Sequence, residues 1–202
     1  MTKSQADVVR AALEILDERG MAAVSMRTIA QRLGVRMNTV LWHAKSKARL
    51  LELMADAIVG AAPLDGLPEQ WRERAAELAR RYRHALLAHR DGAAVVAGTY
   101  AAEPATLDFA ELLVAALLEG GLPEREAAWT CWSLVYFVLG LTSEEQAVPL
   151  PMHGPPDGME NPGALTRVLD VGERPALRRV APMLTEESFA GRFEFGIAKL
   201  LS

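Results

Sequence analysis

The chain has 202 residues, of which half are apolar and 24% are charged, and its net charge at neutral pH is −4. This balance is typical of a globular protein and excludes an intrinsically disordered chain. The longest apolar stretch, residues 129–142, is shorter than the about 20 residues that a membrane-spanning helix needs, and no secretion signal follows Met1. The single cysteine, Cys131, cannot form an internal disulfide. We therefore expect a cytoplasmic protein without a membrane partner.

Charge is distributed unevenly along the sequence. Residues 1–60 contain nine lysines and arginines against six carboxylates, whereas the remainder is acidic, and no Asp or Glu occurs between Glu18 and Glu52. The basic residues in this interval are Arg19, Arg27, Arg32, Arg36, Lys45, Lys47 and Arg49. A basic region on an otherwise acidic chain predicts a polyanionic partner for that region. The alternative is a solvated basic face that has no partner.

Helical periodicity dominates the sequence, and no stretch alternates as a strand does, so we predict an all-α fold. Ser4 can cap a first helix that ends near Gly20, and Ser25 can cap a second that ends at Gly34. A third short helix is expected over 36–43. Only Gly34 and Val35 separate the second helix from the third, so the turn between them is tight. Two short helices joined in this way predict a three-helix N-terminal domain with a helix-turn-helix.

The remaining sequence predicts a larger helical domain. A helix is expected over 47–60, followed by a segment rich in proline and glycine at 62–68. Further helices are expected from Trp71 to about 89, at 92–99, at 105–119, from Pro123 to about Leu141, and from about 186 to the end, with a loop at 149–163. We expect a DNA-binding domain over 1–46 and a regulatory domain for ligand binding and dimerisation over 47–202, connected by the 47–60 helix.

Two apolar helices predict self-association. The stretch Trp129–Leu141 is apolar on nearly every side, and the last helix carries Phe193 and Ile197 on one face. A domain of this size can cover one such helix more easily than both, so packing against a second copy would complete the burial. Gly140 and Gly196 would allow close helix approach. A monomer with one central core helix is the alternative.

The segment Leu33-Gly-Val-Arg-Met-Asn-Thr-Val-Leu-Trp-His-Ala-Lys-Ser-Lys47, preceded by Ser25-Met-Arg-Thr-Ile-Ala30, resembles the DNA-reading segment of the tetracycline-repressor family. The resemblance implies that helix 36–43 lies in the major groove of a DNA operator. The DNA-contacting residues that it implies are Arg27, Arg36, Met37, Asn38, Thr39, Leu41, Trp42, His43 and Lys47.

These positions differ in what they can contact. Arg27 matches a base-reading arginine that can bind guanine, Asn38 can pair with adenine, and Met37 can make only apolar contacts, for example with a thymine methyl group. Thr39, Trp42, His43 and Lys47 correspond to phosphate or groove-wall contacts, which set register. Leu41 replaces the usual tyrosine and removes a hydroxyl that could bind phosphate. Core packing is the alternative for Trp42, and a surface or capping role is the alternative for His43.

The C-terminal part is similar to the tetracycline-binding branch of the family at 89–99, at 140–146 and in the last helix, 189–201. In that branch a histidine holds a magnesium–drug chelate and an asparagine grips the drug, whereas the corresponding residues here are Val96 and Leu78. Valine cannot bind a metal and leucine cannot form a hydrogen bond. Glu144 corresponds to a carboxylate near that metal, but a solvated surface acid is the simpler interpretation. We expect neither a metal nor a cofactor.

The resemblance nevertheless implies a cavity. Its predicted lining residues are Leu78, Tyr82, Leu86, Val96, Thr99, Trp132 and Tyr136. Apolar walls with a few hydroxyl and indole donors suit a small hydrophobic molecule that contains rings. The alternative is a tightly filled core in a regulator without a ligand.

These features predict a ligand-responsive transcriptional regulator. We expect a repressor that binds a palindromic operator as a homodimer and is released by a small hydrophobic effector. A constitutive DNA-binding regulator or an activator is the alternative. We do not expect an enzyme, because the histidines at 43, 84, 89 and 153 are scattered and no nucleophile elbow or phosphate-binding loop occurs.

Overall fold

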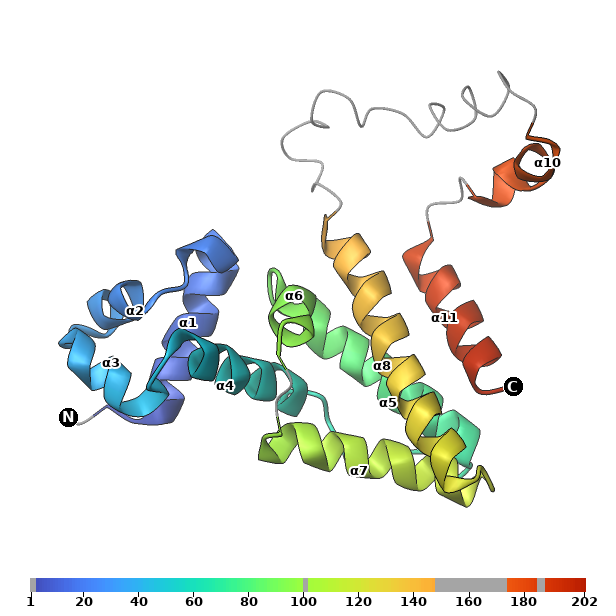
Figure 1. Cartoon of the computed structure of the whole chain (residues 1–202), viewed down its shortest axis with the longest axis horizontal. Helices are drawn as coiled ribbons and strands as arrows, with labels where there is room; N and C mark the ends of the chain where they lie inside the picture. The colour runs from blue at the N-terminus through green and yellow to red at the C-terminus, as the bar shows by residue number, and fades with distance from the viewer. Residues whose placement is uncertain (1–2, 100–101, 148–173, 185–187) are drawn as a thin grey trace.

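The computed structural model describes residues 3–99, 102–147, 174–184 and 188–202. Within these ranges every regular element is helical, which confirms the all-α prediction. The N-terminal helices are α1 (Gln5–Arg19), α2 (Met26–Leu33) and α3 (Met37–Ala44), with a short 3-10 turn at Met21–Ala23. Helix α4 (Lys47–Gly60) connects them to α5 (Trp71–Leu87), α6 (Gly92–Ala97), α7 (Pro104–Glu119), α8 (Glu124–Ala147), α10 (Pro175–Leu184) and α11 (Phe189–Leu200) (Figure 1).

The first two helices begin and end where the sequence predicts. Ser4 and Asp7 form a reciprocal capping box at the start of α1, and Ser25 and Thr28 form a second one at the start of α2. Each box satisfies backbone N–H groups that the first helical turn leaves without partners. Gly34 ends α2 in the left-handed conformation with φ 64°, which glycine adopts without steric cost.

One apolar core runs through the described chain. Ile29 and Val40 are fully buried among α1, α2 and α3, and α4 continues this core with Leu50, Met54 and Ile58. Helix α4 packs against α1 and α3 on one side and against α5, α6 and α7 on the other. Helix α4 is therefore in direct contact with both the N-terminal bundle and the larger part of the molecule.

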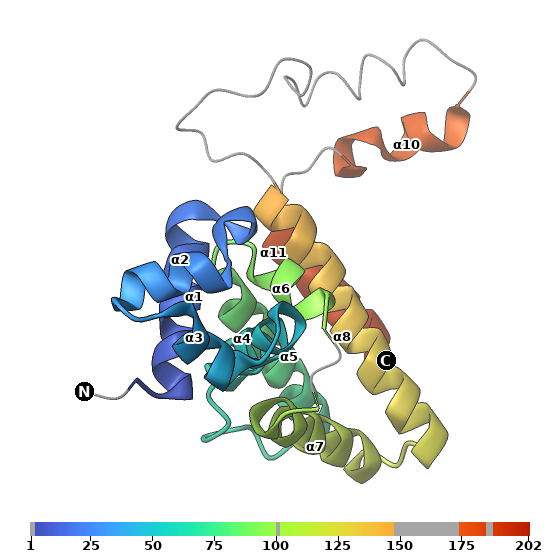
Figure 2. The same cartoon turned by 60° about the vertical axis from the view of Figure 1, so that its left-hand side comes forward.

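Helix α5 lies at the centre of the larger part of the molecule, where it contacts α6, α7, α8 and α11. Helices α8 and α11 lie side by side and run in opposite directions (Figures 1 and 2). Their packing is close, because a Cβ atom at Gly196 would lie 2.1 Å from Cζ of Phe137. Gly196 thus serves packing within the chain, whereas Gly140 faces open space.

Helix α8 continues beyond the predicted end at Leu141, through a polar segment. The Gln146 side chain accepts a hydrogen bond from the backbone N–H of Ala93 and donates to two backbone carbonyls at and just beyond the end of α5. Glu145 forms an ion pair with Arg83 of α5, with N···O distances of 2.6 and 2.7 Å. These contacts with α5 and α6 stabilise the last turns of α8. The apolar periodicity of the sequence does not predict these turns, because their side chains are polar.

Helix α10 was not predicted from the sequence. Along this helix the apolar residues Leu177, Val180 and Leu184 have helical spacing. Ala181 is its only buried residue, so the helix contributes little to the core. The predicted loop at 149–163 and the predicted start of the last helix at 186 lie outside the described residues. Nowhere in the described parts of the chain is a helix long and apolar enough to cross a membrane.

Candidate DNA-binding surface and ligand pocket

Helices α2 and α3 form the predicted helix-turn-helix. The turn between them is closed by the backbone N–H of Val35, which donates to the carbonyl of Ala30 at 3.0 Å. Val40 and Ala44 bury one side of α3 against α1 and α2. The opposite side of α3 is therefore free to enter a groove of DNA.

The predicted DNA-contacting residues lie on this free side or at its edges. Six of them are exposed, namely Arg27, Arg36, Met37, Asn38, Trp42 and Lys47, and three are half-buried, namely Thr39, Leu41 and His43. Trp42 is 81% exposed, which rules out the core-packing alternative for this side chain. The backbone carbonyl of His43 accepts a hydrogen bond of 3.0 Å from the Gln5 side chain, which ties α3 to α1.

The structure divides the basic residues from α2 to the start of α4 into two groups. Arg32 pairs with Glu14 and Glu18 of α1, and its guanidinium lowers the pKa of the Glu18 carboxyl. Arg49 pairs with Glu52 and with Glu103, which precedes α7. The second group, Arg27, Arg36, Lys45 and Lys47, is exposed and forms no ion pair within the described residues. These four cations give the helix-turn-helix its available positive charge.

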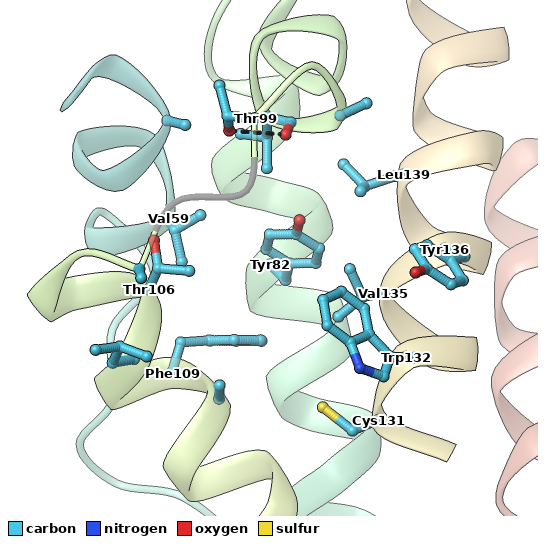
Figure 3. Close-up of a pocket in the computed structure, with 16 residues that line it drawn as sticks. Val59, Tyr82, Thr99, Thr106, Phe109, Cys131, Trp132, Val135, Tyr136 and Leu139 are labelled. Atoms are coloured by element: carbon cyan, nitrogen blue, oxygen red, sulfur yellow. Dashed lines mark hydrogen bonds between the residues drawn. The ribbon is translucent and has the colours of Figure 1, made fainter. Parts of the chain in front are cut away.

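A cavity of about 490 Å³ lies between α4, α5, α6, α7 and α8 (Figure 3). Its size falls within the about 300–1,000 Å³ that is usual for small-molecule sites. Its lining residues are Ala55, Val59, Tyr82, Val96, Ala97, Thr99, Ala102, Thr106, Leu107, Phe109, Ala110, Cys131, Trp132, Val135, Tyr136 and Leu139. None of these side chains carries a charge, so the described walls are suited to a neutral molecule.

Five of the seven predicted pocket residues come together around this cavity, namely Tyr82, Val96, Thr99, Trp132 and Tyr136. Leu78 and Leu86 lie one turn before and one turn after Tyr82 on the same face of α5, but both are fully buried in the core and do not line the cavity. Sequence reasoning missed the contributions of α4 and α7. It also missed Cys131, Val135 and Leu139, although their spacing of four residues on α8 places them next to the predicted Trp132 and Tyr136.

Most polar groups of the pocket already have partners or reach solvent. The Thr99 hydroxyl donates to the Val96 carbonyl at 3.0 Å, and the Thr106 hydroxyl donates to Oδ1 of Asp56 at 2.9 Å. Trp132 and Tyr136 stack with ring centroids 5.4 Å apart and are each about half exposed, so they lie where the cavity meets solvent.

Helix α4 both lines the pocket and packs against the N-terminal helices α1 and α3. Ala55 and Val59 form part of the cavity wall. Between them on the sequence, Asp56 accepts hydrogen bonds from the backbone N–H of Thr106, at 2.8 Å, and from its hydroxyl. The Arg49–Glu103 ion pair ties the same two helices together nearer the N-terminal bundle.

A second connection joins the N-terminal bundle to the turn between α5 and α6. Nδ1 of His89 lies 3.0 Å from the Asp17 carboxylate, which also accepts a hydrogen bond from the backbone N–H of Arg90. The carboxylate of Asp91 accepts a hydrogen bond of 2.9 Å from the backbone N–H of Met21. The segment that leads into the pocket-lining helix α6 is thus anchored to the bundle.

The positions that correspond to metal-site residues of the tetracycline-binding branch do not form such a site. Val96 lines the cavity, Leu78 lies in the core, and Glu144 is exposed and does not contribute to the cavity wall. Within the described ranges, no group of three or more His, Cys, Asp or Glu side chains could hold a metal ion.

Comparison with known proteins identifies the family to which the chain belongs. Residues 8–54 match the family model described as bacterial regulatory proteins of the tetR family, and residues 63–202 match that of the tetracyclin repressor-like C-terminal domain. The chain belongs to the tetracycline-repressor (TetR) family of transcriptional regulators, as its sequence predicts.

Relatives extend over nearly the whole chain. The tetracycline repressor class A of transposon 1721 from Escherichia coli is 33% identical over 205 residues, which cover 100% of this chain and 90% of that protein. ActR of Streptomyces coelicolor, solved in complex with actinorhodin, superposes with a TM-score of 0.87 at 27% identity and covers 100% and 96% of the two chains. BioQ, solved with its double-stranded DNA operator, superposes with a TM-score of 0.66 at 34% identity over 72% of this chain and 89% of that one.

Proposed function

We propose that the protein is a repressor that a small, neutral, hydrophobic molecule releases from DNA. The observation that carries this proposal is the position of α4, which forms part of the cavity wall and packs directly against α1 and α3. A molecule that fills the cavity must press on the helix that supports the helix-turn-helix. Residues 1–46 would form the DNA-binding domain and residues 47–202 the regulatory domain.

The exposed face of the helix-turn-helix supports DNA binding. In the proposed complex, α3 lies in the major groove, where Asn38 and Met37 contact bases, while Arg27 of α2 binds a guanine. Trp42 and Lys47 contact the phosphate backbone. The related structure of BioQ with its DNA operator supports this use of the fold.

An unpartnered apolar stripe supports a homodimer. Trp129, Trp132, Tyr136 and Gly140 follow one another along one side of α8, and Trp129 is 61% exposed. Phe195 of the adjacent α11 is 67% exposed. Pairing of these two helices with their copies around a two-fold axis would bury the stripe. Two helix-turn-helix units would then read the halves of a palindromic operator about 34–36 Å apart.

The pocket supports release by a ligand. The relatives include a tetracycline repressor and ActR, which was solved with actinorhodin. In the proposed mechanism the ligand binds best to a conformation in which the two helix-turn-helix units are wrongly spaced, so it depletes the DNA-binding state. The Asp56–Thr106 and Arg49–Glu103 contacts would transmit the shift from α7 to α4.

Fluorescence anisotropy tests the proposal. The purified protein is titrated into labelled fragments from the region upstream of its own gene, with scrambled DNA of equal length as the control, at one fixed salt concentration. Neutral aromatic compounds that raise the melting temperature are then added to the complex. We expect specific binding and its loss with at least one stabilising compound.

Other results of these titrations would indicate another kind of DNA-binding protein. Specific binding that no stabilising compound weakens would indicate a constitutive regulator. Equal binding to the scrambled DNA at this salt concentration would indicate an architectural protein. A promoter fusion that gains expression when the protein is present would indicate an activator.

A further inference from the structure

The Tyr82 hydroxyl is a polar group of the cavity wall whose hydrogen is free for a molecule inside the cavity. Tyr82 is 4% exposed and lines the cavity, and its hydroxyl forms no hydrogen bond with any described residue. Figure 3 shows the hydroxyl pointing into the space between Val59, Thr99 and Leu139. Its ring is held against Phe109, with ring centroids 5.1 Å apart, so the hydroxyl has a fixed position on the wall. A ligand that fills the cavity must accept this hydrogen bond, or it leaves the donor unsatisfied at a cost in affinity.

The other hydroxyls of the pocket differ from that of Tyr82. Thr99 and Thr106 use their hydrogens inside the protein, on the Val96 carbonyl and the Asp56 carboxylate, so their oxygens can only accept. Tyr136 is 57% exposed in the single chain and lies on the α8 stripe of the proposed dimer interface, so its hydroxyl is at the rim of the cavity. Among the hydroxyls of the described wall, Tyr82 is therefore the one that is left to donate to a ligand deep in the cavity.

The environment keeps the Tyr82 hydroxyl a donor. Burial raises the pKa of Tyr82 far above its ordinary value, because the phenolate would lose its hydration. The phenol consequently keeps its proton at any physiological pH. Since the described walls carry no charged side chain, an anionic or cationic ligand would find no counter-charge there.

We propose that the ligand is a neutral, largely apolar compound with a carbonyl oxygen that accepts a hydrogen bond from Tyr82. The apolar part of the ligand would lie between Phe109 of α7 and the α8 wall, and the carbonyl would point to Tyr82 of α5. This inference rests on the pocket proposed above and adds the chemical group that the pocket selects.

A matched pair of compounds tests the assignment. 9-Fluorenone and fluorene share one flat ring system, but only fluorenone carries a carbonyl. The dissociation constants of both are measured with full-length protein in the absence of DNA, by equilibrium dialysis and chromatographic quantification. We expect fluorenone to bind about tenfold more tightly than fluorene, which is the effect of one buried hydrogen bond.

Tyr82→Phe is the decisive variant. It removes no hydrogen bond within the described protein, so we expect it to fold with an unchanged or higher melting temperature and to lose the preference for fluorenone while still binding fluorene. Tyr136→Phe, which removes a hydroxyl from the rim of the same cavity, should reduce the preference less.

The outcomes separate this inference from the proposed function. An unchanged preference in Tyr82→Phe, equal binding of the two compounds to the unaltered protein, or binding of neither would overturn the assignment of Tyr82. A preference that depends on Tyr82, in a protein that no compound releases from DNA, would uphold the assignment and contradict the release mechanism alone.

Discussion

At the scale of single residues, position within the fold gives chemically identical side chains different roles. Arg27 and Arg32 lie on the same short helix, α2. Arg32 turns toward α1, where Glu14 and Glu18 neutralise it, whereas Arg27 is exposed and forms no ion pair within the described residues. The sequence presents both as members of one basic run, and the packing of α1 against α2 separates them.

We predict that Arg27→Ala weakens specific operator binding by about 1–3 kcal/mol, because the alanine cannot bind the guanine edge. Arg32→Ala is the matched control on the same helix, and its main expected effect is a small loss of stability. Anisotropy titrations of both variants at one salt concentration measure the difference. Equal losses of operator affinity would contradict the assigned role of Arg27.

Cys131 gives a residue-scale report on the pocket. It is the single cysteine of the chain, it lines the cavity, and burial raises the pKa of its thiol. Only the thiolate reacts with an aromatic disulfide reagent. We predict that the reaction rate rises with pH around a midpoint above that of the urea-unfolded chain, and that bound 9-fluorenone slows the reaction at every pH. A midpoint equal to that of the unfolded chain would mean that the thiol is solvated.

At the scale of secondary-structure elements, the joint between α4 and α7 is the contact most specific to the proposed mechanism. The first turn of α7 has no side-chain cap of its own, and Asp56 of α4 accepts the Thr106 N–H in its place. Gly60 allows the close approach, since a Cβ atom there would lie 2.9 Å from that of Ala105. A carboxylate at a helix N-terminus is also favoured by the helix dipole.

We predict that Asp56→Ala lowers the free energy of unfolding by about 1–3 kcal/mol, because it leaves two partly buried donors of Thr106 without an acceptor. Asp108→Ala on α7 is the control. Asp108 is exposed, so its loss should change stability by less than about 0.5 kcal/mol. Urea denaturation followed by circular dichroism measures both, and indistinguishable midpoints would show that the joint contributes no stability.

At the scale of the whole molecule, the described chain leaves a large apolar face uncovered. Trp129, Trp132 and Tyr136 of α8 and Phe195 of α11 are each about half exposed or more. Soluble monomers rarely expose so many aromatic side chains along adjacent helices. Because Trp132 and Tyr136 also line the cavity, the same face borders the proposed ligand site.

We predict that sedimentation equilibrium gives twice the chain mass of 22.0 kDa, and that Trp129→Glu combined with Phe195→Glu gives monomers, because buried unpaired carboxylates oppose association. Leu118→Glu is the matched control, since Leu118 is 43% exposed but lies on α7. The double variant should also lose most of its operator affinity, because only the dimer engages both half-sites. A wild-type chain that sediments as a monomer at micromolar concentration would contradict the proposed dimer.

The sequence by itself determined the features that depend on local chemistry. Ser4, Ser25, Gly20 and Gly34 fix the ends of α1 and α2, because capping and left-handed backbone depend on the residue at the helix end. The helix-turn-helix could also be recognised from the sequence, because all the residues that resemble the family's DNA-reading segment lie within residues 25–47. Tyr82, Val96, Thr99, Trp132 and Tyr136 were brought together by resemblance alone.

Only the tertiary structure decided the features that depend on distant neighbours. It placed Leu78 and Leu86 in the core, although they lie one turn either side of Tyr82 on the same face of α5, because the cavity meets only the middle of that face. It extended α8 through its contacts with α5 and α6, and it added α4 and α7 to the pocket wall. A helical period shows which residues share a face, but the partner of that face follows from the packing of all helices together.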